Sequence, residues 1–105
     1  MYKHTIYLPK HDNDRSEQSY LTGMDICNEL AEHLALYYGG CTILSGVGYY
    51  MMETDVQMDE VWAIHVVHTI PDIRTNLSFF IDKIKTDMKQ ESVLITTEHI
   101  NAYFT

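Results

Sequence analysis

The order of its apolar patterns constrains the fold of this chain more than any single motif does. Strand-like apolar segments surround two segments with helical spacing, in the order strand, helix, strand, strand, helix, strand. This order predicts a ferredoxin-like βαββαβ fold of the α+β class, a four-stranded antiparallel sheet with two helices on one face. We expect a single domain over residues 1–105.

The expected bounds follow from local signals. Strands are predicted over 2–8, 41–52, 60–70 and 91–104, helices over 22–38 and 71–88, and a polar connection over 53–59. Thr22 and Asp25 have the spacing of a capping box, so the first helix should begin at Thr22. Residues 16–21 could add an earlier turn, although Gly23 disfavours a continuous helix. Pro71 suits the first position of the second helix.

The third predicted strand is apolar on both faces. Its apolar side chains are Val61, Trp62, Ala63, Ile64, Val66 and Val67. Right-handed connections give the sheet order 4-1-3-2, which places this strand centrally and the second and fourth strands at the edges. Both helices lie on one face, so apolar side chains remain on the other. An uncovered apolar face marks an interface, and we therefore predict a homodimer through the sheet face.

Charge and composition narrow the classes of partner. The net charge is −8, from 15 acidic and 7 basic residues, and no basic stripe is present. We therefore expect no direct contact with nucleic acid and favour a basic protein surface as partner. No apolar run of membrane-spanning length and no apolar leader occurs, so we predict no membrane association and a cytoplasmic location.

The histidines do not form a pattern that would bind a metal. His65 and His68 are three residues apart on a strand, so their side chains should lie on opposite faces. Glu29 and His33 are one helical turn apart and could supply two ligands, but no third ligand is near in the sequence. Gly46-Val47-Gly48 lacks the third glycine of a dinucleotide motif. We predict no metal, no cofactor and no catalytic residue.

The predicted topology brings several polar segments to one end of the sheet. The ends of the first two strands meet the starts of the third and fourth strands there. The residues at this rim are His11, Tyr50, Glu60, Gln90 and Glu91. An aromatic ring, carboxylates and an amide at a common rim indicate a binding site. Rim solvation and hairpin capping are the alternative explanation of the same residues.

Several of these segments carry a family resemblance. The chain resembles a group of small, mostly uncharacterised α+β proteins encoded by phages and mobile elements. The resembling segments are 2–9, 39–42, 46–50, Glu60 and 90–93, within about two thirds of the chain. Members often have tryptophan where Tyr50 stands and a glycine in the hairpin turn, which residues 53–59 lack. The resemblance implies a ferredoxin-like fold and a phage origin, but no reaction.

Two functional hypotheses follow. The first is a small acidic protein-interaction domain, phage-encoded, that inhibits a host or defence protein by binding it. The alternative is a small-ligand-binding domain or enzyme that uses the polar rim at Tyr50, Glu60 and Gln90. The acidic surface and the exposed sheet face favour the first hypothesis, whereas a polar pocket at the rim would favour the second.

Overall fold

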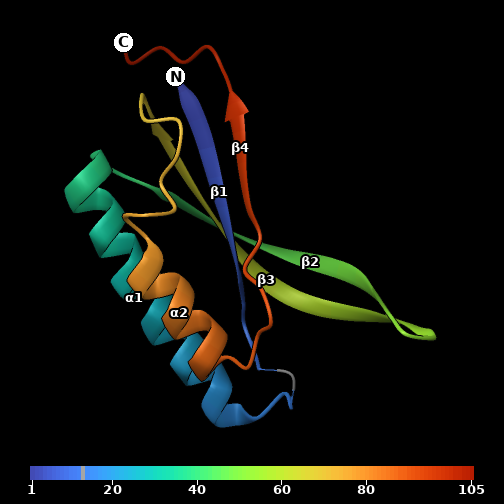
Figure 1. Cartoon of the computed structure of the whole chain (residues 1–105). Helices are drawn as coiled ribbons and strands as arrows, with labels where there is room; N and C mark the ends of the chain where they lie inside the picture. Colours follow the sequence, from blue (N-terminus) through green and yellow to red (C-terminus); the bar gives the residue numbers. More distant parts are fainter. Residues whose placement is uncertain (13) are drawn as a thin grey trace.

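The sheet and helices follow the predicted order in the computed structural model, which describes residues 1–12 and 14–105. The elements are β1 (Tyr2–Pro9), α1 (Glu17–Tyr38), β2 (Thr42–Met52), β3 (Asp55–His68), α2 (Ser78–Asp87) and β4 (Ile95–His99). The strands form an antiparallel sheet in the order β2-β3-β1-β4, and both helices lie on one face (Figure 1). The ferredoxin-like α+β class and the strand order are confirmed.

The core lies between the helices and the central strands. Ile6 and Leu8 of β1 and Ile64 and Val66 of β3 point to the helices and are fully buried. The apolar stripe of α1 meets them with Ile26, Cys27, Leu30 and Leu34. The valine and isoleucine side chains of β3 suit such a half-buried, pleated surface. None of the helices in the described part of the chain is long and apolar enough to cross a membrane.

Helix α1 begins earlier than its capping pattern indicates. Ser16 is the N-cap, and its side chain accepts a hydrogen bond from the Ser19 N–H at 3.1 Å. Thr22 lies inside the helix and donates its hydroxyl to the Gln18 carbonyl. Gly23 is also interior, where an added Cβ would lie 3.2 Å from the Lys10 carbonyl oxygen. The start at Thr22 is therefore wrong, and the alternative that residues 16–21 add an earlier turn is confirmed. Gly23 does not break the helix, because it allows the close approach of the Pro9 and Lys10 carbonyl groups.

Helix α2 begins later than predicted, at Ser78 instead of Pro71. The Asp72 carboxylate accepts a hydrogen bond from the Arg74 N–H at 3.0 Å and also binds the Arg74 guanidinium. This local turn competes with helix formation, as aspartate side chains commonly do. Ile73 and Leu77 are still buried in the core, so the predicted apolar stripe is right although its first part is not helical.

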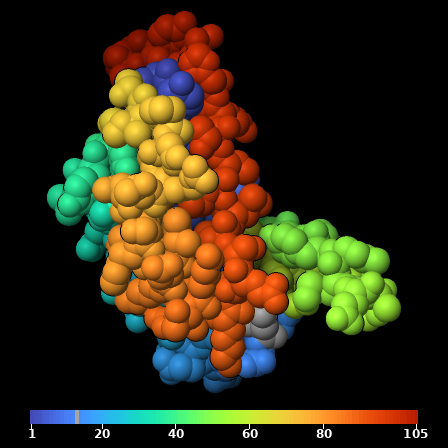
Figure 2. Space-filling view, in the orientation of Figure 1, coloured from blue at the N-terminus to red at the C-terminus, as the bar shows by residue number. Residues whose placement is uncertain are grey.

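The second and third strands form a hairpin much longer than predicted. Strand β3 begins at Asp55, and only Glu53 and Thr54 form the turn, so 55–59 are strand and not a loop. The outer part of this hairpin, residues 47–60, projects from the rest of the molecule and is called the arm below (Figure 2). No helix covers the arm, so polar residues can take strand positions there without being buried.

The fourth strand is shorter than predicted and pairs only with β1, through Ile95–His99. Its edge position agrees with its polar composition. Residues 100–105 lie beyond the ladder, and Tyr103 and Phe104 are exposed.

The pairing register settles which side chains of β3 face away from the helices. Val61, Ala63, His65 and Val67 lie on this open face, whereas Trp62, Ile64 and Val66 face the helices. Leu44 of β2 pairs with Ala63 and is 51% exposed on the open face. Thr5 and His65 share a hydrogen bond of 2.8 Å there, and burial lowers the pKa of His65. The open face is thus a mixed surface with apolar residues at its centre.

Candidate functional site

A pocket lies where the loop after β1 runs along the edge of β3. It encloses about 200 Å³ and is lined by His11, Arg15, Met58, Asp59 and Glu60; we call it the rim pocket. The loop is attached to β3 by a hydrogen bond from the Lys10 N–H to the Glu60 carbonyl at 2.9 Å. Strand β1 ends at Pro9, opposite Val61, so the β3 edge beyond Val61 is open to side chains of the loop.

Arg15 spans the pocket from the loop to β3. Its Nη2 donates to the Met58 carbonyl and lies 3.2 Å from Asp59 Oδ1. The pocket therefore combines one guanidinium with two neighbouring carboxylates, Asp59 and Glu60, at the edge of a single strand. A mixed-charge arrangement of this kind can hold a ligand that carries both charges.

His11 forms the inner wall of the rim pocket. Its ring lies 5.3 Å from the ring of Tyr20, which in turn lies 5.9 Å from Trp62. The Nδ1 atom of His11 is buried and has no hydrogen-bond partner among the described residues. Native structures leave few buried polar atoms unpaired, and those that remain often belong to functional sites.

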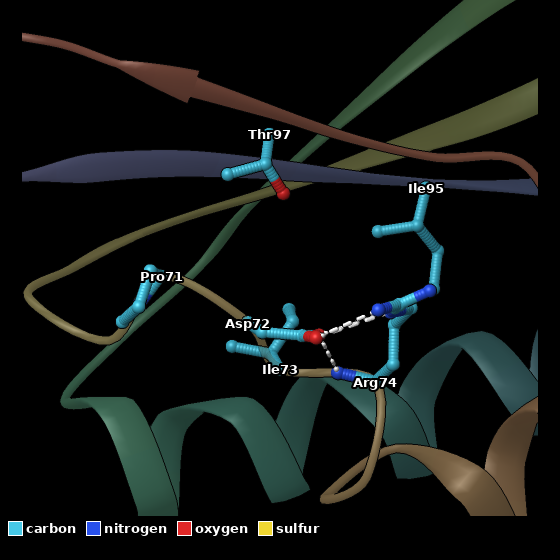
Figure 3. Close-up of a pocket in the computed structure, with 6 residues that line it drawn as sticks. All are labelled: Pro71, Asp72, Ile73, Arg74, Ile95 and Thr97. Atoms are coloured by element: carbon cyan, nitrogen blue, oxygen red, sulfur yellow. Dashed lines mark hydrogen bonds and ion pairs between the residues drawn. The ribbon is translucent and has the colours of Figure 1, made fainter.

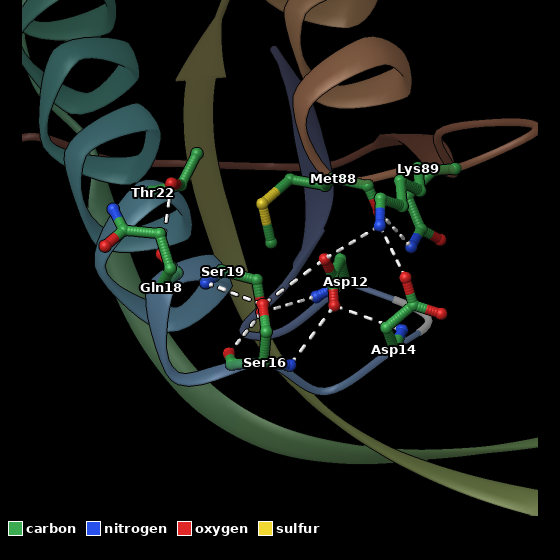
Figure 4. A network of polar contacts seen from close by, with 9 residues as sticks. Asp12, Asp14, Ser16, Gln18, Ser19, Thr22, Met88 and Lys89 are labelled. Carbon is green, nitrogen blue, oxygen red and sulfur yellow. Dashed lines mark hydrogen bonds and ion pairs between the residues drawn. The ribbon is translucent and has the colours of Figure 1, made fainter.

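Asp12, in the loop that carries His11 and Arg15, is the centre of a network of polar contacts with Asp14, Ser16, Ser19 and Lys89 (Figure 4). The Asp12 carboxylate accepts hydrogen bonds from the N–H groups of Asp14 and Ser16, and its own N–H donates to Ser19 Oγ. Lys89, at the end of α2, pairs with Asp14 and lies 3.7 Å from Asp12. Burial alone would raise the Asp12 pKa, but the Ser16 N–H and the Lys89 charge outweigh it and hold that pKa below its usual range.

Tyr50 lies on the arm and does not line the rim pocket. It pairs with Gln57, whereas Glu60 pairs with Val47, so the two side chains are on opposite faces of the hairpin. The Tyr50 ring lies over Gly48, where an added Cβ would come within 2.5 Å of its hydroxyl oxygen. Gly48 pairs with Asp59, so the Tyr50 ring lies on the open face of the hairpin, over the glycine opposite Asp59. The space that a side chain at position 48 would need is therefore occupied by the Tyr50 ring.

Gln90 and Glu91 follow the end of α2 and do not line the rim pocket. The Gln90 amide donates to the Met88 carbonyl at 2.9 Å, and Glu91 is exposed. Of the residues predicted from sequence, the structure thus brings His11 and Glu60 into one pocket. Sequence reasoning missed Arg15 and Asp59. The available signal was a lone arginine in the polar loop and an acidic pair, Asp59-Glu60, at the start of a strand.

A second cavity lies between the β3–α2 connection and β4 (Figure 3). It encloses about 300 Å³ and is lined by Pro71, Asp72, Ile73, Arg74, Ile95 and Thr97. Arg74 and Asp72 form an ion pair with distances of 2.8 and 3.1 Å, and this guanidinium lowers the Asp72 pKa to about 2. The two charged groups of this cavity therefore form a bidentate pair with each other, whereas the rim pocket has the single-nitrogen Arg15–Asp59 pair and a second carboxylate, Glu60.

The histidines lie apart, as their spacing indicates. His65 is on the open face, whereas His68 contacts Tyr38 of α1, with ring centroids 5.1 Å apart. His33 shares a hydrogen bond of 2.7 Å with Asn76, and Glu29 pairs with Lys83 at 3.3 Å. The described residues hold no cluster of three His, Cys, Asp or Glu side chains suited to a metal.

No protein-family model and no curated protein matches the sequence. Solved structures do share its fold. The periplasmic divalent cation tolerance protein CutA from Archaeoglobus fulgidus superposes with a TM-score of 0.56 at 14% identity, covering 99% of this chain and 88% of that one. CutA1 from Pyrococcus horikoshii gives 0.59 at 12% identity, with 99% and 87% covered.

A phage protein is also among these neighbours. A phage SAM lyase in complex with S-methyl-5'-thioadenosine superposes with a TM-score of 0.61 at 13% identity, covering 92% of this chain and 79% of that chain. Identities this low establish a shared ferredoxin-like fold. The fold expected from the family resemblance is thus confirmed, and one structural neighbour is a phage protein.

Proposed function

We propose that this chain binds an adenosine sulfonium or thioether in the rim pocket and releases S-methyl-5'-thioadenosine from S-adenosylmethionine. The observation that carries the proposal is the meeting of His11, Arg15, Asp59 and Glu60 in one pocket. The phage SAM lyase with its bound thioether supports it, since the two chains share a fold. This is the ligand-binding or enzyme hypothesis that the polar rim raised from sequence.

The charges of the pocket suit such a substrate. S-adenosylmethionine carries a sulfonium cation, and Asp59 and Glu60 are carboxylates that attract cations. Release of the thioether breaks the bond between sulfur and the four-carbon chain, and the electron pair stays on sulfur. As that bond breaks, either a base takes a proton from the adjacent carbon and a C=C bond forms in the four-carbon fragment, or the fragment's own carboxylate oxygen displaces the sulfur and forms a C–O bond that closes a lactone. Glu60 is exposed at the pocket and is the group we assign to the proton in the first route.

Turnover tests this proposal directly. Purified protein incubated with S-adenosylmethionine should accumulate S-methyl-5'-thioadenosine, measured by liquid chromatography with mass detection. Glu60→Gln should lower the rate at least about 100-fold, a typical contribution of general acid–base groups. Glu32→Gln, on the exposed surface of α1, is the matched control and should leave the rate unchanged. Absence of both thioether release and ligand binding in the wild type would refute the proposal.

We also propose that a second copy covers the open face of the sheet. The open face continues from Ala63 through Val61 to Tyr50 on the arm, and β2 contains no charged residue along its exposed edge. Edge strands that remain in contact with solvent usually carry charged side chains, which β2 lacks. Because each chain has a net charge of −8, electrostatic repulsion between two copies is weakest where an uncharged strand such as β2 forms the contact. The rim pocket encloses about 200 Å³, less than typical ligand sites of about 300–1,000 Å³, so residues supplied by a second copy would enlarge the site.

Light scattering with surface variants tests the association. Wild-type protein at micromolar concentration should be larger than a monomer. Leu44→Lys on the open face should shift it toward monomer, whereas Leu36→Lys, at an 83% exposed position on α1, should not. A monomeric wild type would eliminate the association. A dimer that both variants leave intact would instead place its interface elsewhere.

The second candidate is stoichiometric inhibition of a host or defence protein by this chain as a phage-encoded binder. The exposed apolar arm is the feature that favours it, because Tyr49, Met51 and Val56 could be buried by a partner. If the partner surface is basic, the association rate should fall as the salt concentration rises, because salt screens the attraction between opposite charges. Asp55→Lys should then lower the association rate. A cytoplasmic location without nucleic acid or membrane contact goes with either function and stays a prediction.

A further inference from the structure

Arg15 has a backbone conformation that its residue type disfavours. Its φ is 53°, in the left-handed region, and Lys89 is the other described non-glycine residue with positive φ. Such a conformation is unfavourable for a residue with a side chain and persists where the surroundings impose it. Here the Arg15 N–H donates to the Asp12 carbonyl at 3.0 Å, and the Asp12 carboxylate holds the next residue, Ser16. The loop thus directs Arg15 toward β3.

The guanidinium of Arg15 is only partly used by its protein contacts. Nη2 makes both the contact with the Met58 carbonyl and the one with Asp59. An arginine carries five N–H donors in a planar arrangement, and Nε and Nη1 take part in none of the contacts found among the described residues. The side chain is 53% exposed, so its ion pair with Asp59 adds little stability. Donors suited to a carboxylate are therefore available at the pocket.

The second arginine of the chain provides a contrast. Arg74 donates hydrogen bonds to the Asp72 carboxylate from both Nε and Nη2. The donor pair suited to a carboxylate is therefore already used within the protein. Arg15, by contrast, contacts one carboxylate, Asp59, through Nη2 alone. Glu60, on the opposite face of β3 from Asp59, also lines the pocket, and no other arginine or lysine does so among the described residues. A ligand with an anionic group near Arg15 and a cationic group near the carboxylates would satisfy both sides. An α-amino acid group has this charge pattern.

We infer that Arg15 recognises the amino-acid carboxylate of the ligand and so distinguishes amino-acid-bearing adenosine compounds from S-methyl-5'-thioadenosine. This inference rests on the proposed function of the rim pocket. S-methyl-5'-thioadenosine has no carboxylate and no ammonium group, so it gains nothing from Arg15. The same contact would retain substrate and let the neutral thioether leave.

Calorimetric titration with two thioethers, neither of which carries a sulfonium charge, tests the inference. S-adenosylhomocysteine carries the amino-acid group, and S-methyl-5'-thioadenosine lacks it. Arg15→Gln should weaken S-adenosylhomocysteine binding about 10-fold or more, the size expected for a hydrogen bond to a charged group. The same substitution should change the affinity for S-methyl-5'-thioadenosine by less than about twofold. Arg15→Lys should recover part of the loss, because it keeps the charge without the planar donors.

Arg74→Gln is the matched control and should change neither affinity. Circular dichroism and thermal melting establish that each variant is folded. Equal weakening of both ligands by Arg15→Gln would overturn the inference, since Arg15 would then only shape the pocket, while the proposed function would stand. Tighter binding of S-adenosylhomocysteine by Arg15→Gln would overturn it as well. A wild type that binds neither ligand would overturn both the inference and the proposed function.

Discussion

The body and the arm belong to one sheet with one continuous register, yet they bury their side chains differently. In the body, Ile64 and Val66 of β3 are buried beneath α1 and α2. In the arm, Val56 of the same strand is 66% exposed, and Met51 opposite it is 71% exposed. Both parts contain apolar strand residues, so apolar content does not decide burial. Burial is decided by whether a layer of helices covers the strand, and within a single chain no helix covers the arm.

The body and the arm also differ in whether their carboxylates are hydrogen-bonded within the protein or exposed to solvent. Asp12 lies in the body and is 8% exposed, with its oxygens hydrogen-bonded to the surrounding loop. Glu60 lies at the base of the arm and is exposed at the rim pocket. Polar groups that are satisfied internally stabilise the fold, whereas groups held open at an edge can bind other molecules.

The largest expected effect separates the body from the arm by stability. Ile64→Ala should lower the free energy of unfolding by about 2–5 kcal/mol, since it empties a fully buried position. Val56→Ala should change it by less than about 0.5 kcal/mol, as surface substitutions usually do. Urea denaturation at low protein concentration measures both. A Val56→Ala cost close to that of Ile64→Ala would mean that the arm is buried in an assembly even when dilute.

An intermediate effect concerns the first turn of α1, which borders the rim loop. Ser16→Ala should lower the free energy of unfolding by about 1 kcal/mol, because it removes the acceptor for the Ser19 N–H. Thr22→Ala lies in the helix interior and should be neutral or slightly stabilising. Chemical denaturation compares the two variants. The reverse order would restore the helix start that the capping pattern predicts.

A smaller effect should appear only in acid. The folded pKa of Asp12 lies below its unfolded value of about 3.9. Its stabilising contribution is therefore complete above the unfolded pKa and is lost as the pH falls through the folded pKa. Asp12→Asn should be less stable than wild type at pH 7, and the difference should shrink below about pH 4. Thermal melting across this pH range checks it. A difference independent of pH would show that Asp12 acts without its charge.

The smallest expected effect is that of metal removal. The histidines lie at separate places on the body, and none is on the arm. We predict equal melting temperatures with and without a chelator. A melting temperature that falls by many degrees in chelator would reveal a structural metal.

Sequence reasoning succeeded where burial follows a regular period. The apolar stripe of α1 and the two apolar faces of β3 were recognisable because residues at helical or strand spacing share a face. It was wrong at boundaries that local side chains or tertiary contacts decide. Asp72 accepts a hydrogen bond from the Arg74 N–H, and α2 therefore begins after this turn. Gly23, inside α1, allows the Lys10 carbonyl to lie close to the helix. The polar run 55–59 was read as a loop because nothing local shows that it pairs with β2.

For the candidate site, the sequence placed His11 and Glu60 together because the topology brings the end of β1 to the same rim as the predicted start of the third strand. It could not place Tyr50, whose position depends on the length of the hairpin, or Arg15. The contact of Arg15 with Asp59 joins residues 44 positions apart. It exists because the loop after β1 follows the β3 edge.

By itself, the sequence determined the order of elements, the fold class and the central place of β3, since these depend on the spacing of apolar residues along the chain. Only the tertiary structure decided that an uncovered arm projects from the sheet and that Arg15 spans a pocket at its base. Those features depend on pairing register and on contacts between distant segments, for which local periodicity carries no signal.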